Sequence, residues 1–124
     1  MDWQKSPESL VQTFAEALPE APTVERRRMF GFPAAFAGGN MFAGLHGNDV
    51  LVRLPEDARA TLLSEPGAHL FEPMAGRPMR EYVVLPPSVV ADLAALREWL
   101  DRGFQFASAM PPKEKTKPAE KKRT

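Results

Sequence analysis

The sequence predicts a single two-layer α+β domain in which helices cover an antiparallel sheet. Three observations lead to this fold class. The chain has 124 residues, which is about the length of one domain. Its apolar residues follow a helical period near both ends and a strand-like alternation between them, and glycine or proline separates the segments. The resulting order is helix, three strands, helix, two strands and helix, which is typical of two packed layers.

The first helix is predicted to begin at Ser6 and Pro7, because serine caps a helix well and proline suits its first position. Pro19 and Pro22 end the segment. Between them, four apolar residues repeat at helical spacing: Leu10, Val11, Phe14 and Leu18. This helix is therefore expected to place one apolar stripe on the sheet.

Three strands are predicted next, in "RRMFGFPAAFA", "NMFAGLH" and "VLVRL", joined by glycine turns into an antiparallel meander. Pro33 donates no ladder hydrogen bond, so the first strand is predicted to be an edge or to be bulged there. In the third strand, alternation separates Leu51 and Arg53 from the residues of the opposite face, Val50, Val52 and Leu54. One face of this meander is expected to be buried.

The second half begins with a short helix in "PEDARATLLSE", ended by Pro66 and Gly67. Two strands, "HLFEP" and "REYVVLP", follow and are linked by "MAGRPM". A last helix is predicted from about Asp92 to Met110, with Gly103 kinking it or ending it early. One face of this helix is apolar: Leu93, Leu96, Trp99 and Leu100.

The chain divides into a predicted domain over residues 1–110 and a lysine-rich tail over residues 111–124, which is predicted to be disordered because it lacks large apolar residues. Residues 1–111 carry ten basic and fourteen acidic side chains, whereas residues 112–124 carry six basic and two acidic side chains. The body is thus mildly acidic and the tail is basic. Any nucleic-acid contact is expected to be local, through the tail or the arginine triplet "RRRMFG".

The composition excludes several classes of protein. The chain has no cysteine, so it has neither disulfides nor thiolate metal sites, in keeping with a reducing cytoplasm. Its first residues do not form a secretory signal. The uncharged stretch from residue 29 to 48 contains five glycines and a proline, which argues for strands and turns against a membrane helix. We expect a cytoplasmic protein without a membrane contact.

No catalytic or cofactor motif stands out in the chain. The two histidines, His46 and His69, lie beside a turn and at a strand start, and no G-x-S-x-G or H-E-x-x-H segment accompanies them. The glycines of "AGGNMFAG" lack the lysine of a phosphate-binding loop. We therefore predict no catalytic residue, no metal ligand and no cofactor, and the sequence favours a protein that is not an enzyme.

Four segments in order resemble the N-terminal domain of the TfoX/Sxy family: "RRRMFG", "GGNMFAGLHGNDVLVRL", "FEPMAGRPMREYVVLP" and "DLAALREWLDRGFQFA". The resemblance covers about residues 5–110. It implies an α+β fold like that of type III secretion chaperones. The family takes its name from competence regulators that activate transcription together with a cyclic-AMP receptor protein, and these regulators carry a second, helical domain. Here a short tail stands in that place, so a stand-alone member is expected.

Two positions depart from the family pattern, with Phe32 in place of a frequent glycine and Arg53 in place of a frequent lysine. Arginine keeps the charge but presents a planar fork. An anion site at Arg53 is one hypothesis. The candidate contacts for an anion or nucleic acid are Arg26, Arg27, Arg28, Arg53, Lys121, Lys122 and Arg123.

The arginine triplet has two interpretations. Alternation sends Arg26 and Arg28 to one face of a strand and Arg27 to the other, so the three do not form one flat patch. An arginine-guarded edge strand that resists aggregation is the favoured interpretation, and an anion or nucleic-acid contact is the other. Met74 and Met79 flank a turn where flexible side chains fill the core or line a groove for a partner.

Three functions follow from these observations. The first is a bacterial, regulatory module that binds a protein partner, with weak nucleic-acid contact through the tail. The second is direct binding of DNA or RNA through Arg26–Arg28 and the tail. A small-molecule enzyme or binder around Arg53 and Arg59 has the least support. Open strand edges also allow a homodimer.

Overall fold

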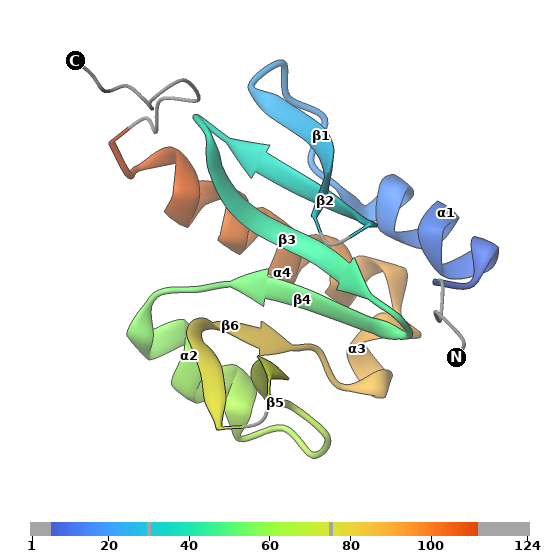
Figure 1. Ribbon diagram of the computed structural model, residues 1–124, viewed down its shortest axis with the longest axis vertical. Coiled ribbons are helices and arrows are strands. Elements are labelled where there is room, and N and C mark those ends of the chain that lie inside the picture. The colour runs from blue at the N-terminus through green and yellow to red at the C-terminus, as the bar shows by residue number, and fades with distance from the viewer. Residues whose placement is uncertain (1–5, 30, 75, 112–124) are drawn as a thin grey trace.

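The computed structural model describes residues 6–29, 31–74 and 76–111 (Figure 1). The predicted tail and its cations Lys121, Lys122 and Arg123 lie outside these residues, apart from Pro111. Ten elements follow one another in the chain: α1 (Glu8–Ala17), β1 (Val24–Met29), β2 (Phe32–Ala37), β3 (Asn40–His46), β4 (Asp49–Arg53), α2 (Glu56–Leu63), β5 (His69–Met74), β6 (Arg77–Val84), α3 (Pro87–Val90) and α4 (Leu93–Ser108).

The strands form one six-stranded antiparallel sheet in the order β1-β2-β3-β4-β6-β5. This confirms the predicted α+β fold with an antiparallel sheet. Strands β1 to β4 follow the chain as a meander, and β6 pairs with β4 so that β5 forms the second edge. The arginine-rich segment therefore lies on an edge strand, as the favoured interpretation of the triplet requires.

The prediction of one strand in "RRMFGFPAAFA" is wrong, because this segment is the β1–β2 hairpin. Gly31, with φ of +82°, stands between the two strands, and glycine adopts this conformation without steric cost. The pairs run from Val24↔Ala37 to Met29↔Phe32. Pro33 lies in β2, the second strand, one residue outside the β2–β3 register. The edge strand is thus β1, the strand without the proline.

Three smaller predictions also need correction. Ser6 does not cap α1: the N-cap is Pro7, no side chain caps the helix, and the Ser6 hydroxyl is buried without a hydrogen-bond partner. The link between the last two strands is shorter than the predicted "MAGRPM", since β5 extends to Met74 and β6 begins at Arg77. The short helix α3 was not predicted. Gly103 does not end the last helix early, because α4 continues through it to Ser108.

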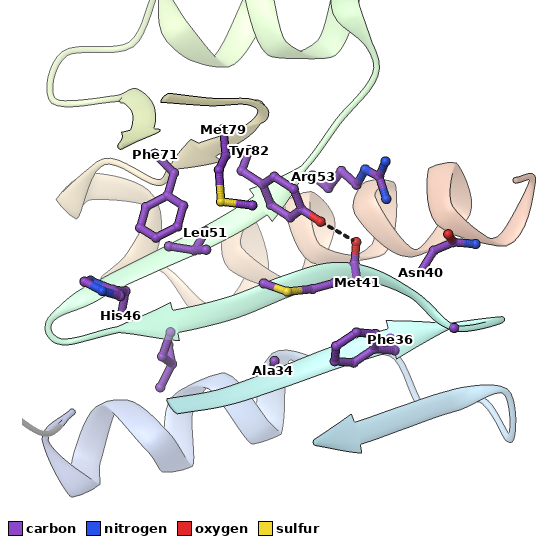
Figure 2. Close-up of a pocket in the computed structure, with 12 residues that line it drawn as sticks. Ala34, Phe36, Asn40, Met41, His46, Leu51, Arg53, Phe71, Met79 and Tyr82 are labelled. Atoms are coloured by element: carbon purple, nitrogen blue, oxygen red, sulfur yellow. Dashed lines mark hydrogen bonds between the residues drawn. The ribbon is translucent and has the colours of Figure 1, made fainter. Parts of the chain in front are cut away.

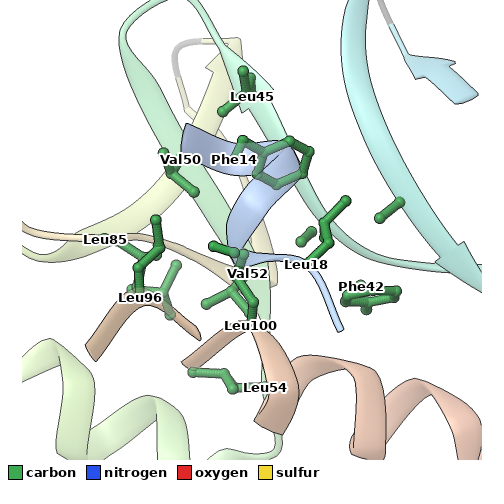
Figure 3. Close-up of a cluster of buried hydrophobic side chains, with 14 of the residues drawn as sticks. Phe14, Leu18, Phe42, Leu45, Val50, Val52, Leu54, Leu85, Leu96 and Leu100 are labelled. Carbon is green, nitrogen blue, oxygen red and sulfur yellow. The ribbon is translucent and has the colours of Figure 1, made fainter. Parts of the chain in front are cut away.

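All four helices contribute to one apolar core on a single face of the sheet. Phe14 and Leu18 come from α1 and its end, Leu96 and Leu100 from α4, and Phe42 from β3 (Figure 3). Leu62 of α2 and Val89 of α3 belong to the same cluster. Asp92 begins α4 by accepting hydrogen bonds from the backbone N–H groups of residues 94 and 95. The opposite face of the sheet has no helix in the part of the chain that the structure describes.

Candidate functional site

The helix-free face of the sheet carries a second cluster of buried side chains: Ala34, Phe36, Met41, Leu51, Phe71, Tyr82 and Val84. These residues come from β2, β3, β4, β5 and β6. Leu51 and Arg53 face this side while Val50 and Val52 face the core, which confirms the predicted alternation in β4. The sheet thus has apolar residues on both faces, although the described helices cover only one.

The second cluster surrounds a pocket of about 280 Å³ (Figure 2). Register shifts occur in β2–β3 at Ala35/Phe36 and in β5–β6 on both sides of Phe71. Such bulges bend strands and increase their twist, so the sheet can curl around its own helix-free face. The volume lies just below the usual range for drug-sized ligands. The pocket therefore fits a few apolar side chains or a small molecule.

Tyr82 and Arg53 form one wall of the pocket. The Tyr82 hydroxyl donates a hydrogen bond of 3.1 Å to the backbone carbonyl oxygen of Met41, across the sheet from β6 to β3. The Arg53 guanidinium lies 5.6 Å from the centre of the Tyr82 ring. Its Nε and one terminal nitrogen approach Oε1 of Glu81 at 2.7 and 2.6 Å. Arg53 therefore presents a positive charge with one partner carboxylate at the pocket wall.

Burial raises the pKa of Tyr82 above its usual value of 10.0, and the nearby positive charge of Arg53 opposes this shift. Tyr82 is the single tyrosine of the chain, so the ultraviolet absorbance of ionised phenol reports on it alone. We expect Tyr82 to ionise above pH 10.0 in the folded protein and near 10.0 in denaturant. The unfolded state loses its proton first, so the free energy of unfolding should fall as the pH rises above 10.

Rapid mixing to alkaline pH would record the phenolate before unfolding begins, and Tyr82→Phe is the control that abolishes the signal. Ionisation of the folded protein at or below pH 10 would contradict the burial of this wall.

The two ends of the pocket differ in character. At one end, the ring of His46 lies 5.0 Å from Phe32 and 5.3 Å from Phe71, between centroids. At the other end, Asn40 lies beside the last described residue, and its Nδ2 donates a hydrogen bond of 3.1 Å to the carbonyl oxygen of Pro111. The chain thus passes the pocket again at its C-terminal end, far in sequence from the strands.

The structure separates the three arginines of the triplet. Arg27 lies 4.5 Å over the ring of Phe36 on the helix-free face and pairs with Glu25 at 2.6 Å. Arg26 and Arg28 are exposed, and alternation places them on the opposite face. Arg28 donates to the carbonyl oxygen of Gly31 at 2.9 Å, which holds its guanidinium at the hairpin end.

Of the candidate contacts predicted from the sequence, Arg27 and Arg53 lie on the same face as the pocket. Of the residues that line the pocket, the sequence predicted two as contacts: Arg53 for an anion, and Met79 for the core or a partner groove. Met79 packs against the second cluster, whereas the side chain of Met74 lies outside the described residues.

Two further observations limit the classes of site. No group of three or more histidine, aspartate or glutamate side chains that could hold a metal ion occurs in residues 6–29, 31–74 and 76–111. In the same residues, no helix has the length and apolar character needed to cross a membrane.

The fold and the pocket define a small α+β domain whose sheet is covered by helices on one face and carries an apolar pocket on the other. The chain belongs to the TfoX N-terminal domain family, whose pattern it matches over residues 16–107. This match spans most of the described fold, from the end of α1 to the end of α4. Comparison with curated proteins finds no match.

Proposed function

We propose that this TfoX N-terminal domain protein is a non-enzymatic module that binds a protein partner in the cytoplasm, through the pocket on its helix-free face. One observation carries the proposal: an apolar pocket lies on a sheet face that no described helix covers. Concave sites lined by apolar side chains with a few polar groups are the usual places for ligands.

The composition of this face supports a protein as the ligand. The pocket is lined by Met41, Met79, Phe36 and Phe71. Methionine adapts its shape to a partner because its side chain is unbranched and flexible. Aromatic residues, methionine and arginine are also the residue types enriched at protein interfaces. A partner would therefore insert one or two apolar side chains here and cover the surrounding face.

The polar groups of the pocket support a binding role over a catalytic one. Arg53 already pairs with Glu81, and the Tyr82 hydroxyl donates its proton to the Met41 carbonyl. Tyrosine is protonated at neutral pH, and burial raises the pKa of Tyr82 further, so this hydroxyl does not act as a base there. His46 packs between two aromatic rings. These groups shape the pocket and set its polarity.

A matched pair of variants tests the proposal. Ala34→Leu adds a larger side chain on the pocket lining, whereas Ala94→Leu makes the same change at an exposed position of α4. Full-length protein and both variants would be used to capture partners from an extract of the source organism. A captured protein would then be purified and its affinity measured by calorimetry. We expect Ala34→Leu to weaken binding about tenfold or more and Ala94→Leu to leave it unchanged.

Equal affinities for all three proteins would contradict the pocket as the binding site. Circular dichroism and thermal unfolding of Ala34→Leu would establish that the variant is folded before the comparison is made.

A second candidate function is direct nucleic-acid binding. It is favoured by the exposure of Arg26 and Arg28 on one face of the edge strand and by the six basic residues after Pro111. Binding of a fluorescent DNA duplex and a single strand would be measured over a salt series, with the full chain and a version ending at Met110. Counterion release predicts a log-log slope on duplex DNA of about −5 for the six cations of the tail and about −2 for Arg26 and Arg28.

This second function would be established if nucleic acid still binds after removal of the tail and no longer binds a double variant with Arg26→Gln and Arg28→Gln. Binding that disappears with the tail would make nucleic acid a weak accessory contact.

A further inference from the structure

The two edges of the sheet differ in their capacity to pair with a further strand (Figure 1). The edge strand β5 contains Pro73, which has no N–H to donate, and its pairing with β6 shifts register on both sides of Phe71. Interruptions of this kind discourage the addition of a strand. The edge strand β1 pairs with β2 over Val24–Met29 without a shift, so its outer side carries a regular row of backbone groups.

The β1–β2 hairpin determines which backbone groups of β1 point outward. Two residues separate the two strands, and in such a hairpin the closing pair is hydrogen-bonded and bonded pairs then alternate with non-bonded ones. Val24, Arg26 and Arg28 therefore direct their N–H and carbonyl groups away from β2. The N–H of Val24 donates to the carbonyl oxygen of Ala21 at 3.1 Å. The described residues give no hydrogen-bond partner to the outward groups of Arg26 and Arg28.

A second copy of β1 fits this edge best in one antiparallel register, centred on Arg26. In this register Arg26 and its counterpart exchange both backbone hydrogen bonds. On either side of them, the N–H of Arg28 can donate to the Val24 carbonyl oxygen of the second copy. The pairing therefore uses the outward groups that the chain itself leaves open, and it does not need the N–H of Val24.

The charged side chains of β1 select this register. With Arg26 at the centre, Glu25 lies opposite Arg27 of the second copy, and symmetry repeats the pair. A shift by two residues in one direction sets Glu25 opposite Glu25, and a shift in the other direction sets Arg27 opposite Arg27. Opposite charges across two strands stabilise a sheet, whereas like charges destabilise it. Shifts by one residue are excluded because they place outward groups opposite side chains' own inward pairs.

Each copy keeps its own ion pair in this arrangement. Arg27 and Glu25 are 2.6 Å apart on the helix-free face, where Arg27 also lies over the ring of Phe36. Two such pairs facing each other across the strands form a ring of four charges with alternating sign. Exposed ion pairs contribute little free energy, so the charges select the register and the backbone hydrogen bonds provide most of the attraction.

The arginines of the opposite face keep this association weak. Arg26 is exposed, and it would lie directly opposite Arg26 of the second copy, where like charges repel. The aliphatic part of Arg28 would lie over Val24, which is half-buried against the main core. Guarding the edge against other strands is therefore compatible with reversible pairing in a single register.

We propose that the protein forms a reversible homodimer in which two β1 strands pair antiparallel with Arg26 at the two-fold axis. This axis runs perpendicular to the paired strands and through the sheet, so the two six-stranded sheets join into one. Both helix-free faces then lie on the same side, and the dimer presents its two pockets together. The inference concerns a different surface from the pocket and does not depend on the proposed function.

Single-cysteine variants test the register, because the chain has no cysteine of its own. Arg26→Cys would place two cysteines opposite each other with Cα atoms about 5.5 Å apart, a distance that a disulfide spans. Arg28→Cys is the matched control, since its two cysteines would be displaced by four residues, about 14 Å along the strands. In a glutathione redox buffer, we expect Arg26→Cys to form the linked dimer about tenfold faster or more.

A mixture of Val24→Cys and Arg28→Cys is a further test that does not change the central residue. The register places these two positions opposite each other, so we expect the mixed disulfide to form faster than the disulfide of either variant with itself.

Charge reversal tests the same interface without a cysteine. Sedimentation equilibrium over a concentration series would measure the dimer fraction of the full chain and of each variant. We expect Glu25→Arg to abolish the dimer and the double variant with Glu25→Arg and Arg27→Glu to restore it, because the exchange recreates every pair. Arg26→Thr should strengthen the dimer, since it removes the repulsion at the axis. Circular dichroism would confirm that each variant is folded.

Each outcome decides for or against the inference. A monomer at every concentration, or equal rates of linkage for Arg26→Cys and Arg28→Cys, would overturn it. A dimer that Glu25→Arg leaves unchanged would place the contact on another surface and would also overturn it. None of these results bears on the pocket, which the comparison of Ala34→Leu with Ala94→Leu tests separately.

Discussion

Replacement of Gly103 by alanine is expected to lower the free energy of unfolding by about 2 kcal/mol, a typical cost of overpacking. A Cβ atom at this position would lie only 2.6 Å from Cγ2 of Val52. It would also lie 3.0 Å from the carbonyl oxygen of Phe42 and 3.1 Å from the carbonyl oxygen of Arg53, which are both tight contacts. Alanine favours a helix over glycine by about 1 kcal/mol, but the sheet under α4 offers no room for the methyl group.

Denaturant unfolding measures this effect, with Gln105→Ala as the control because Gln105 is exposed on the same helix. The control should stay within about 0.5 kcal/mol of the unchanged protein. An equal or higher stability for Gly103→Ala would mean that α4 lies farther from the sheet than the structure places it.

Phe42→Ala is expected to cost about 4 kcal/mol, within the range for removal of a buried aromatic ring. Phe42 is 0% exposed, and its ring meets Phe104 of α4 edge-on with centroids 5.6 Å apart. The register between β2 and β3 also shifts at this residue. Ala35 pairs with Ala43 and Phe36 pairs with Met41, so Phe42 is one extra residue in β3. The substitution therefore leaves a cavity between the sheet and the helix that neither layer can readily close.

The matched control is Phe106→Ala, because Phe106 lies on α4 but is only partly buried and is not part of the main core. We expect it to cost about 1 kcal/mol or less, measured by the same denaturant unfolding. Similar losses for the two substitutions would contradict the assignment of the core to the face that Phe42 occupies.

The sequence predicted most elements because their periodicity is local. Alternation in β4 placed Leu51 and Arg53 opposite Val50 and Val52, as the structure shows. The same alternation did not predict the turn at Gly31, because apolar residues on both sides of a single glycine are also typical of one continuous strand. Strands that are buried on both faces lose the alternation that would mark their ends.

Gly103 shows a second limit of local reasoning. Its low helix propensity predicts a kink or an end in α4, and the helix nevertheless continues to Ser108. The contact with Val52 explains why, since only a residue without a side chain lets the helix approach the sheet so closely. Tertiary packing stabilises the helix where propensity disfavours it.

The pocket lay beyond what the sequence could predict. Its lining residues, such as Phe36, Leu51, Phe71 and Tyr82, are far apart in the chain and come from different strands. Alternation indicates the face on which a residue lies, but not the curvature that turns this face into a pocket. Register shifts occur near Phe36 and Phe71 beside the pocket, and shifts of this kind bend strands but have no clear signature in a single sequence.

Methyl NMR of the full chain, titrated with the captured partner, measures most directly whether the helix-free face is the binding face. Ala34, Met41 and Met79 line the pocket, whereas Ala94 is exposed on α4 behind the sheet. We predict that the methyl signals of these three pocket residues shift on binding while that of Ala94 stays in place. Shifts confined to the helices, with the three pocket signals unchanged, would contradict the pocket as the binding site.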